Sequence, residues 1–193
     1  MYYTKRVLLS ISIVVFFSTL FVYGQSNTER PTAWATKITS TSLKNLYKIN
    51  DSIYRCEQPD NTAFQELSNI GIKSLLDLKK NHTDSTIAGQ NPVHIYNVGM
   101  DSDNFTDKEI IAALKIILHA PKPIAVHCQH GADRTGVVIA MYRICFQNWT
   151  KEQAIDELRN GGYNFHENHI NIPKYINDVD VAKIKKSVFS NIE

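Results

Sequence analysis

The stretch His127-Cys-Gln-His-Gly-Ala-Asp-Arg-Thr-Gly136 follows a short apolar run, Ile124-Ala-Val-His127, and leads into a segment, 134–147, that is apolar on almost every side. This succession predicts a buried strand, a tight loop and a buried helix. Open α/β sheets bind their ligands at such a junction, beyond the carboxyl end of a strand. The stretch therefore predicts both an α/β fold and the place of its functional site.

The loop inside this stretch has the properties of an anion-binding site. Five residues separate Cys128 from Arg134, so the backbone can curl with its N–H groups directed at one anion, near the positive end of the following helix. Gly131 permits a backbone conformation that a side chain would obstruct. The same field favours the thiolate form of Cys128, which is a nucleophile. The Arg134 guanidinium can hold two oxygens of a phosphoryl group, so thiolate attack on a bound phosphoryl group is the chemistry that fits.

Strand and helix patterns alternate through the rest of the chain. Two capping boxes, Thr106-Asp-Lys-Glu109 and Thr150-Lys-Glu-Gln153, predict helix starts, and Gly71 and Gly161 predict helix ends. Strands separated by helices predict a central, largely parallel sheet flanked by helices. The expected strands are 52–56, 72–78, 93–98 and 124–127, with a polar loop at 79–91; the expected helices follow Asp60 (with Phe64, Leu67 and Ile70 on one face), Thr106, Asp133 and Thr150, and a last helix carries Ile172, Tyr175, Ile176 and Val179.

Residues 127–136 match every fixed position of the signature H-C-x-x-G-x-x-R-S/T-G, and the chain thereby resembles the cysteine-dependent protein tyrosine phosphatases. Over about residues 45–180 it is similar to the compact dual-specificity phosphatases of bacteria, with Ile53-Tyr-Arg-Cys-Glu-Gln-Pro59 before the loop and Trp149-Thr-Lys-Glu-Gln-Ala154 after it. Two positions depart from those proteins, which commonly have Ser in place of Cys56 and Arg in place of Lys79. The resemblance implies a dual-specificity phosphatase-like fold and hydrolysis of phosphotyrosine, with or without phosphoserine and phosphothreonine.

The resemblance also implies roles for individual residues. Phosphate is transferred to Cys128 as a cysteinyl-phosphate, while an Asp on a preceding loop protonates the leaving oxygen. Asp101 and Asp103 both lie between the expected strand and helix, and Asp101 is favoured because it directly follows Val98-Gly-Met100. Asp107 is better explained as a first-turn helix charge.

The other residues of the loop are expected to bind substrate. Thr135 can donate a hydrogen bond to the Cys128 sulfur and ease its departure, and His127 is expected to order the loop through hydrogen bonds rather than to act as a base. The expected substrate-binding residues are Gln129, His130, Gly131, Ala132, Asp133 and Thr135.

No metal and no cofactor is expected, because thiolate, Arg and helix dipole supply the chemistry. His166-Glu-Asn-His169 resembles the zinc-binding motif H-E-x-x-H, but its two histidines are one residue closer together than that motif requires. The sequence offers no third ligand beside it, so a solvated loop is the preferred interpretation.

Two other functions stay open as alternatives to a protein phosphatase. The first is a phosphatase for inositol phosphates or phospholipid headgroups. Such loops often carry Lys to hold extra phosphates, whereas the segment between Cys128 and Arg134 contains none, which favours a substrate with one phosphate. The second is a catalytically silent module that binds phosphoproteins, which loss of Cys128 or Arg134 would favour, and both are present.

The charge balance of the chain argues against nucleic acid as a partner. The chain carries 21 Lys and Arg against 19 Asp and Glu, and Lys5 and Arg6 are the only charged side chains before Glu29. The remainder is therefore balanced, which argues against nucleic-acid binding through bulk positive charge. The expected partner is a phosphorylated protein or a small phosphomonoester.

Residues 1–24 have the pattern of an export signal. Lys5 and Arg6 precede the apolar run Val7–Val22, and Val22-Tyr23-Gly24 ends in small residues. The alternative is an uncleaved anchor, in which case 7–22 make the only membrane contact. The chain is expected to be periplasmic or secreted, with 25–45 as a polar linker and 46–193 as the phosphatase domain.

The three cysteines are an odd number for an oxidising compartment, so at least one is expected to be free. Cys145 is expected in the core. Cys56 either packs in the core or traps an oxidised Cys128 as a disulfide.

Overall fold

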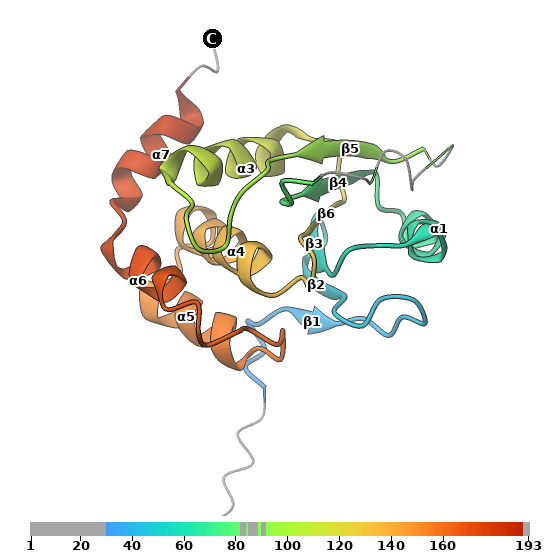
Figure 1. Ribbon diagram of the computed structural model, residues 1–193, viewed down its shortest axis with the longest axis horizontal. Helices are drawn as coiled ribbons and strands as arrows, with labels where there is room; N and C mark the ends of the chain where they lie inside the picture. Colours follow the sequence, from blue (N-terminus) through green and yellow to red (C-terminus); the bar gives the residue numbers. More distant parts are fainter. Residues whose placement is uncertain (1–29, 82–83, 85–88, 90–91, 191–193) are drawn as a thin grey trace, which may run out of the picture.

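The computed structural model describes residues 30–81, 84, 89 and 92–190, and its centre is a six-stranded sheet (Figure 1). The spatial order is β1-β2-β3-β6-β4-β5. Strands β3, β6, β4 and β5 run parallel, whereas β2 is antiparallel to both of its neighbours. The largely parallel sheet expected from the sequence is confirmed. The strands are β1 (Thr36–Lys37), β2 (Tyr47–Asn50), β3 (Ile53–Cys56), β4 (Ser74–Asp77), β5 (His94–Asn97) and β6 (Ile124–His127).

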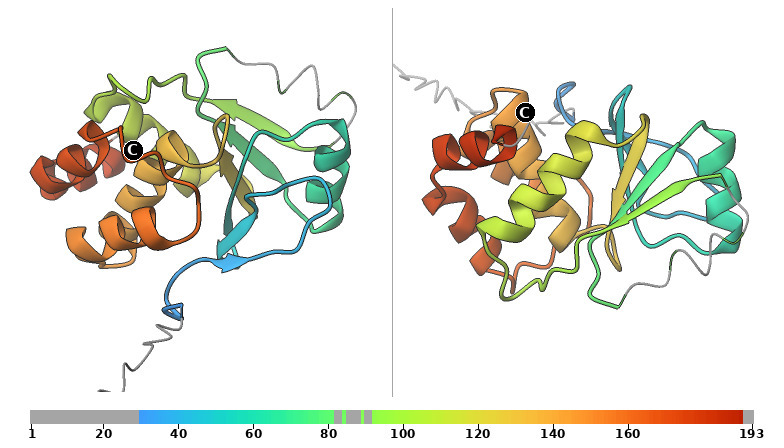
Figure 2. Two further views of the ribbon diagram at one scale, coloured as in Figure 1. Left: turned by 60° about the horizontal axis from the view of Figure 1, so that its bottom comes forward. Right: turned by 90° about the horizontal axis from the view of Figure 1, so that it is seen from above.

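Helices cover both faces of the sheet, as the two views of Figure 2 show. Among the described helices, α1 lies on one face, and the others form a layer on the opposite face, around α4. The described helices are α1 (Asn61–Asn69), α3 (Asp107–His119), α4 (Asp133–Phe146), α5 (Lys151–Asn160), α6 (Asn171–Asp178) and α7 (Val181–Phe189).

The core has two parts, one on each side of the sheet. The larger part surrounds α4, whose residues Val137, Val138 and Met141 have no exposed surface. The smaller part lies under α1 and contains Phe64 and Leu67. All four residues of β6 are buried between them, so the strand that leads into the signature loop is enclosed on both faces.

Local sequence signals placed most helix ends correctly. Both capping boxes form, at Thr106 with Glu109 and at Thr150 with Gln153. The Asp60 carboxylate caps α1 by accepting from the Ala63 N–H group. These side chains satisfy free N–H groups of the first helical turn, so α1, α3 and α5 begin where the sequence predicts.

Two helix predictions were wrong in detail. Ile70, expected on the buried face of α1, follows the last turn of that helix and is 39% exposed. The expected last helix is followed by another: α6 ends at Asp178, and the Asp180 carboxylate caps α7 by accepting from the Lys183 N–H group. Helix α7 packs on α3 and α4, and its Ile184 and Val188 are fully or almost fully buried.

Residues 30–45, expected to form a linker, pack against the domain. The Arg30 guanidinium donates to the Gly161 carbonyl at 2.8 Å, and the Ala35 N–H group donates to Glu157 Oε1 at 2.7 Å. Ala35 and Leu43 are buried. The folded unit therefore begins well before residue 46.

The predicted export signal at 1–24 lies outside the described residues. Within the described part of the chain, no helix combines the length and apolar character that crossing a membrane requires.

Candidate active site

The signature loop connects the buried end of β6 to the start of α4. The His127 carbonyl accepts from the Leu78 N–H group at 2.9 Å, which fixes the strand end, and α4 begins at Asp133. Ala132, the residue before the helix, forms no side-chain cap. The first N–H groups of α4 therefore stay available to an anion bound in the loop. The nucleophile predicted from the sequence, Cys128, lies at this junction with 2% of its surface exposed.

Gly131 is required by the way the loop packs. Its φ is +67°, and a Cβ there would collide with the backbone of Cys56 and Glu57. The loop is also joined to the segment after β3 by a hydrogen bond from the Gln58 N–H group to the Gln129 carbonyl at 3.2 Å. Only glycine permits both this conformation and this close approach.

The loop is held from inside the protein by a set of buried polar groups, called here the inner support: Arg55, Asn45, Tyr163, Glu157 and Arg143. The Arg55 guanidinium donates to the Gly131 carbonyl at 2.7 Å, and the Asn45 amide donates to the His130 carbonyl at 2.8 Å. Two loop carbonyls are thereby drawn towards the interior. This arrangement leaves the N–H groups of the loop free to face the opposite side, where an anion would bind.

The inner support is continuous. Arg55 lies 3.6 Å from the centroid of the Tyr163 ring, the geometry of a cation–π contact. Burial raises the pKa of Tyr163, so its hydroxyl keeps the proton that it donates to Glu157 Oε1 at 2.9 Å. Glu157 in turn forms a bidentate ion pair with Arg143, at 2.8 and 2.6 Å. The buried charges are therefore paired or hydrogen-bonded, as burial requires.

His127 orders the loop, as expected, through a partner that the sequence did not reveal. Its Nδ1 lies 3.1 Å from the Cys128 carbonyl, and its Nε2 lies 2.6 Å from Asp84 Oδ2. Both His127 and Asp84 are fully buried. Asp84 belongs to the segment expected to be a polar loop, and nothing in its local sequence distinguishes it from the other polar residues there.

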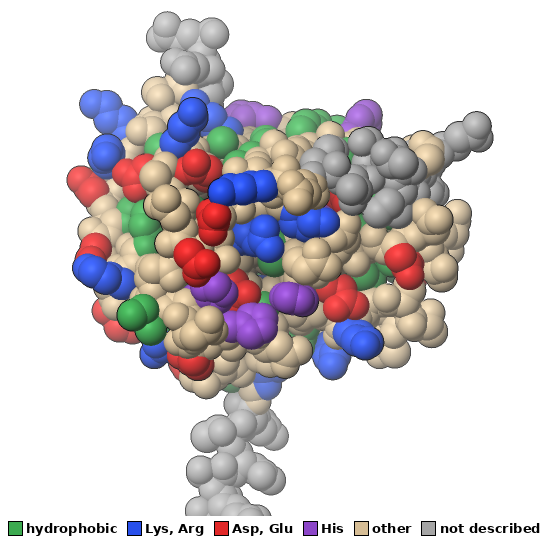
Figure 3. Space-filling model, in the orientation of Figure 1, with side chains coloured by type: hydrophobic (Ala, Val, Ile, Leu, Met, Phe, Trp, Pro, Cys, Tyr) green, Lys and Arg blue, Asp and Glu red, His purple; other side chains and the backbone are tan. Residues whose placement is uncertain are grey.

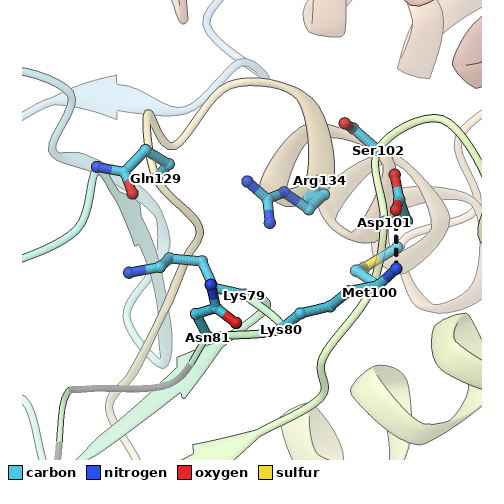
Figure 4. A pocket seen from close by; sticks show the side chains of 8 residues that line it. All are labelled: Lys79, Lys80, Asn81, Met100, Asp101, Ser102, Gln129 and Arg134. Atoms are coloured by element: carbon cyan, nitrogen blue, oxygen red, sulfur yellow. Dashed lines mark hydrogen bonds and ion pairs between the residues drawn. The ribbon is translucent and has the colours of Figure 1, made fainter.

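A cavity of about 260 Å³ opens beside the loop. Figure 4 shows the Arg134 guanidinium pointing into it, with Asp101 on one side and Gln129 on the other. Cys128 does not line the cavity itself; its neighbour Gln129 does. The lining residues are Lys79, Lys80, Asn81, Met100, Asp101, Ser102, Gln129 and Arg134.

The two candidate acids have different surroundings. Asp101 lines the cavity, and its Oδ2 accepts from Lys80 Nζ at 2.8 Å. That hydrogen bond and the Lys80 charge hold the pKa of Asp101 below its usual value. Asp103 does not line this cavity; its carboxylate, 74% exposed, faces His169 Nδ1 at 2.8 Å. Asp107, as expected, lies in the first turn of α3.

Three of the chain's seven histidines gather at the outer edge of the loop, and with Asp133 they are called here the histidine rim: His130, Asp133, His166 and His169. Figure 3 shows histidine side chains grouped on this face of the molecule, below a group of Lys and Arg side chains. His166 Nδ1 lies 2.8 Å from Asp133 Oδ2, and the His130 and His166 ring centroids are 5.5 Å apart. The sequence predicted His130 and Asp133 as residues of the phosphate loop and singled out the His166–His169 pair, but it did not predict that these four side chains lie together.

The remaining predicted residues are buried. Thr135 is fully buried next to the loop, and its hydroxyl has no hydrogen-bond partner among the described residues. Burial raises the pKa of Cys145 to about 11, in keeping with the expected core position. Cys56 and Cys128 are both free and belong to the two different core clusters.

Comparison with known proteins gives a consistent result. The model of the tyrosine phosphatase family matches residues 42–192. The chain is 30% identical over 158 residues to the dual specificity protein phosphatase TpbA of Pseudomonas aeruginosa, covering 81% of this chain and 71% of that protein. It is 23% identical over 158 residues to the inositol diphosphatase DSP5 of Arabidopsis thaliana, covering 77% and 76%.

Solved structures agree with the sequence matches. The crystal structure of a Cys-to-Ser variant of P. aeruginosa TpbA in complex with phosphotyrosine superposes with a TM-score of 0.75 at 28% identity, covering 83% of this chain and 99% of that one. The catalytic core of SIW14, a PP-IP phosphatase of Saccharomyces cerevisiae, superposes with a TM-score of 0.67 at 26% identity, covering 77% and 93%.

Proposed function

The chain belongs to the tyrosine phosphatase family, as a protein-tyrosine or dual-specificity phosphatase, and from this we propose that it hydrolyses phosphotyrosine monoesters through a cysteinyl-phosphate on Cys128. The observation that carries the proposal is the convergence of three elements. The signature loop follows β6, Arg134 enters the cavity from α4, and Asp101 enters it from the loop before α3. Arg134 and Asp101 thus line one cavity from separate segments, and Cys128, the proposed nucleophile, belongs to the same loop as Arg134.

In the first step of the proposed mechanism, the N–H groups of the loop and the Arg134 guanidinium hold the phosphate. The Cys128 sulfur attacks phosphorus, a sulfur–phosphorus bond forms, and the bond from phosphorus to the ester oxygen breaks. Asp101 gives its proton to that leaving oxygen. The lowered pKa of Asp101 fits this role only once substrate is bound, because the negative phosphate opposes the effect of Lys80.

In the second step, water attacks phosphorus and the sulfur–phosphorus bond breaks. The Asp101 carboxylate takes the proton of the attacking water, which restores the acid. The Thr135 hydroxyl is buried and has no hydrogen-bond partner among the described residues, so its proposed hydrogen bond to the departing Cys128 thiolate would form during the reaction. The buried Asp84–His127 pair supports the same end of β6.

A second candidate substrate class is inositol phosphates that carry more than one phosphate. Lys79 and Lys80 line the cavity together with Arg134, so the cavity has cations beyond those that one phosphate needs. Some relatives are inositol diphosphatases. A comparison of kcat/KM on a phosphotyrosine peptide and on an inositol diphosphate distinguishes the classes, and loss of the second activity alone in Lys79→Met would assign the lysine to the extra phosphate.

The first experiment is turnover of an aryl phosphate by the full chain with EDTA and reductant present. Hydrolysis that disappears in Cys128→Ser supports the thiolate mechanism. Absence of hydrolysis in the wild-type chain, with vanadate still bound, would instead favour a phosphoprotein-binding module.

The acid is tested by a matched pair of variants. Asp101→Asn is expected to lower kcat by about 100-fold or more, with vanadate affinity nearly unchanged. Asp103→Asn is expected to lose far less, because its carboxylate bonds His169. An equal or larger loss in Asp103→Asn would transfer the role to Asp103.

The proposed site of action is outside the cytoplasm, supported by the basic start and apolar run of residues 5–22. Fractionation of cells that express the full chain, with amino-terminal sequencing of the recovered protein, tests export and cleavage together. Recovery of the intact chain from the cytoplasmic fraction would contradict export.

A further inference from the structure

The histidine rim brings together three potential metal ligands from two distant segments. One nitrogen each of His130 and His166 and one carboxylate oxygen of Asp133 all lie within 4.8 Å of one another. Ligands around a tetrahedral zinc ion, each about 2.0–2.2 Å from it, lie about 3.3 Å apart. Small side-chain rotations would therefore enclose an ion. We propose that His130, Asp133 and His166 bind one divalent transition-metal ion of the zinc type at the rim of the phosphate loop.

Asp133 is the anchor of this site. Its side chain is only 9% exposed, and its Oδ1 accepts from the His166 N–H group at 3.0 Å. Its Oδ2 lies 2.8 Å from His166 Nδ1. One oxygen is thus held by backbone while the other faces the imidazole, the arrangement expected of a carboxylate that is oriented before it meets an ion.

His169 stands next to the proposed ion, and Asp103 contacts one of its ring nitrogens. Its Nδ1 faces Asp103 Oδ1 at 2.8 Å, and its Nε2 lies 3.8 Å from Asp133 Oδ2. A carboxylate that accepts from one ring nitrogen leaves the other with its lone pair directed away, which is the usual state of a metal-bound histidine. His169 is therefore placed to complete a four-ligand set.

The three imidazole rings of the rim lie close to one another. Asp133 already has the backbone and ring nitrogens of His166 as partners, yet the His130 ring lies 5.5 Å from that of His166, and the His169 ring lies 6.1 Å from it. A shared cation would make this grouping favourable.

The ligand type and the exposure of the site select the class of ion. Imidazole and carboxylate together suit zinc and its neighbours in the transition series rather than calcium or magnesium, which take oxygen ligands. His130 is exposed and the His166 side chain is 47% exposed, so an ion can enter from solvent. The ion is not required by the proposed hydrolysis, which needs only thiolate, Arg and Asp.

The test is a titration of the full chain with Co²⁺, which reports its coordination number through visible absorption. Cys128→Ser is the parent for the titration, because an accessible thiolate could bind the ion instead. One equivalent is expected to give the spectrum of a four- or five-coordinate ion with imidazole ligands, and one equivalent of Zn²⁺ is expected to displace it.

Variants of the rim locate the ion. His166→Gln is expected to weaken binding by at least about 100-fold, and Asp103→Asn, which acts through His169, by about 10-fold. His94→Gln and His119→Gln are matched controls, since both histidines are exposed and distant in sequence from the rim, and both should leave the titration unchanged. Circular dichroism of each metal-free variant checks folding, and His130→Gln replaces His166→Gln if that variant does not fold.

Three results would each overturn the proposal. One is absence of Co²⁺ binding at millimolar concentration in the Cys128→Ser parent. Another is binding that survives both His130→Gln and His166→Gln. The third is binding to the wild-type chain that Cys128→Ser abolishes, which would place the ion on the thiolate.

Discussion

The inner support and the histidine rim hold the same loop from opposite sides, and they differ in almost every physical property. The inner support is buried, and the Arg143–Glu157 ion pair within it is 3% exposed on each side. The rim is reached by solvent, and His166 is 47% exposed. Buried ion pairs are sensitive to the loss of either partner, whereas exposed pairs contribute little to stability. The inner support therefore determines the shape of the loop, and the rim is the part that protons and ions in the medium can reach.

The largest expected effect follows from removing the guanidinium that bonds the loop. Arg55→Met keeps the apolar contact with Tyr163 but removes the donor to the Gly131 carbonyl. Release of that carbonyl misaligns the loop N–H groups, and kcat/KM on an aryl phosphate is expected to fall about 100-fold. Vanadate affinity should fall with it, while the circular dichroism spectrum stays the same.

The matched control is Arg30→Met, because Arg30 also approaches the Tyr163 ring but forms no described hydrogen bond with the signature loop. Its kcat/KM should change far less. An Arg55→Met variant that retains the activity of the control would remove Arg55 from the positioning of the loop.

The next effect is on stability. Glu157→Gln leaves the buried Arg143 charge without its carboxylate, and this is expected to cost about 3 kcal/mol of unfolding free energy. For a domain of this size the corresponding fall in Tm is about 10 °C. Urea denaturation measures the change directly, and a loss below about 1 kcal/mol would show that the pair contributes no more than an exposed one.

A smaller effect concerns pH. Lys80 lowers the pKa of Asp101, chiefly through its hydrogen bond. A general acid is active when protonated, so kcat/KM falls as pH rises through its pKa. Lys80→Met raises the pKa of Asp101 and should move this falling limb to higher pH. The control is Lys79→Met, which removes a nearby cation that bonds Gln58. Its fall in kcat/KM should occur at the same pH as in the wild-type chain. Equal pH profiles for the two variants would contradict the effect assigned to Lys80.

The smallest expected effect is on stability, from an exposed ion pair outside the signature loop. Glu167, in the segment that carries the rim histidines, pairs with Arg159 at 3.3 Å, and the two side chains are 63% and 43% exposed. Glu167→Gln is expected to change the unfolding free energy by less than about 1 kcal/mol, measured by the same urea denaturation. A loss as large as that of Glu157→Gln would show that the exposed Arg159–Glu167 pair contributes as much stability as the buried Arg143–Glu157 pair.

Local features of this molecule were predictable from its sequence because their causes are local. Capping boxes involve residues three positions apart, and the signature loop is one continuous stretch, so the helix starts and the position of Cys128 followed directly. The α6–α7 boundary was missed because it depends on a cap at Asp180 within a run that reads as polar.

The contacts that support the loop were not predictable in this way. Asp84 reaches His127 across 43 residues, and Asp133 reaches His166 across 33. No period or spacing in the sequence encodes such a pair. A signal was present for Arg55, a charged residue inside an apolar strand, since a buried charge calls for a specific partner, but the partner itself, a loop carbonyl, carries no side-chain signature.

The contacts of the inner support also determine when, during synthesis of the chain, the signature loop can be supported. Asn45 bonds the Tyr163 carbonyl across 118 residues, and Ala35 bonds Glu157 across 122. Contacts so distant in sequence form slowly, and a chain emerging from the ribosome cannot form them until its carboxyl-terminal part has been made. A nascent chain that has completed residues 127–136 therefore has its nucleophile but no Tyr163 or Glu157 behind it, and phosphatase activity should appear only after α5 and the turn that follows it have been synthesised.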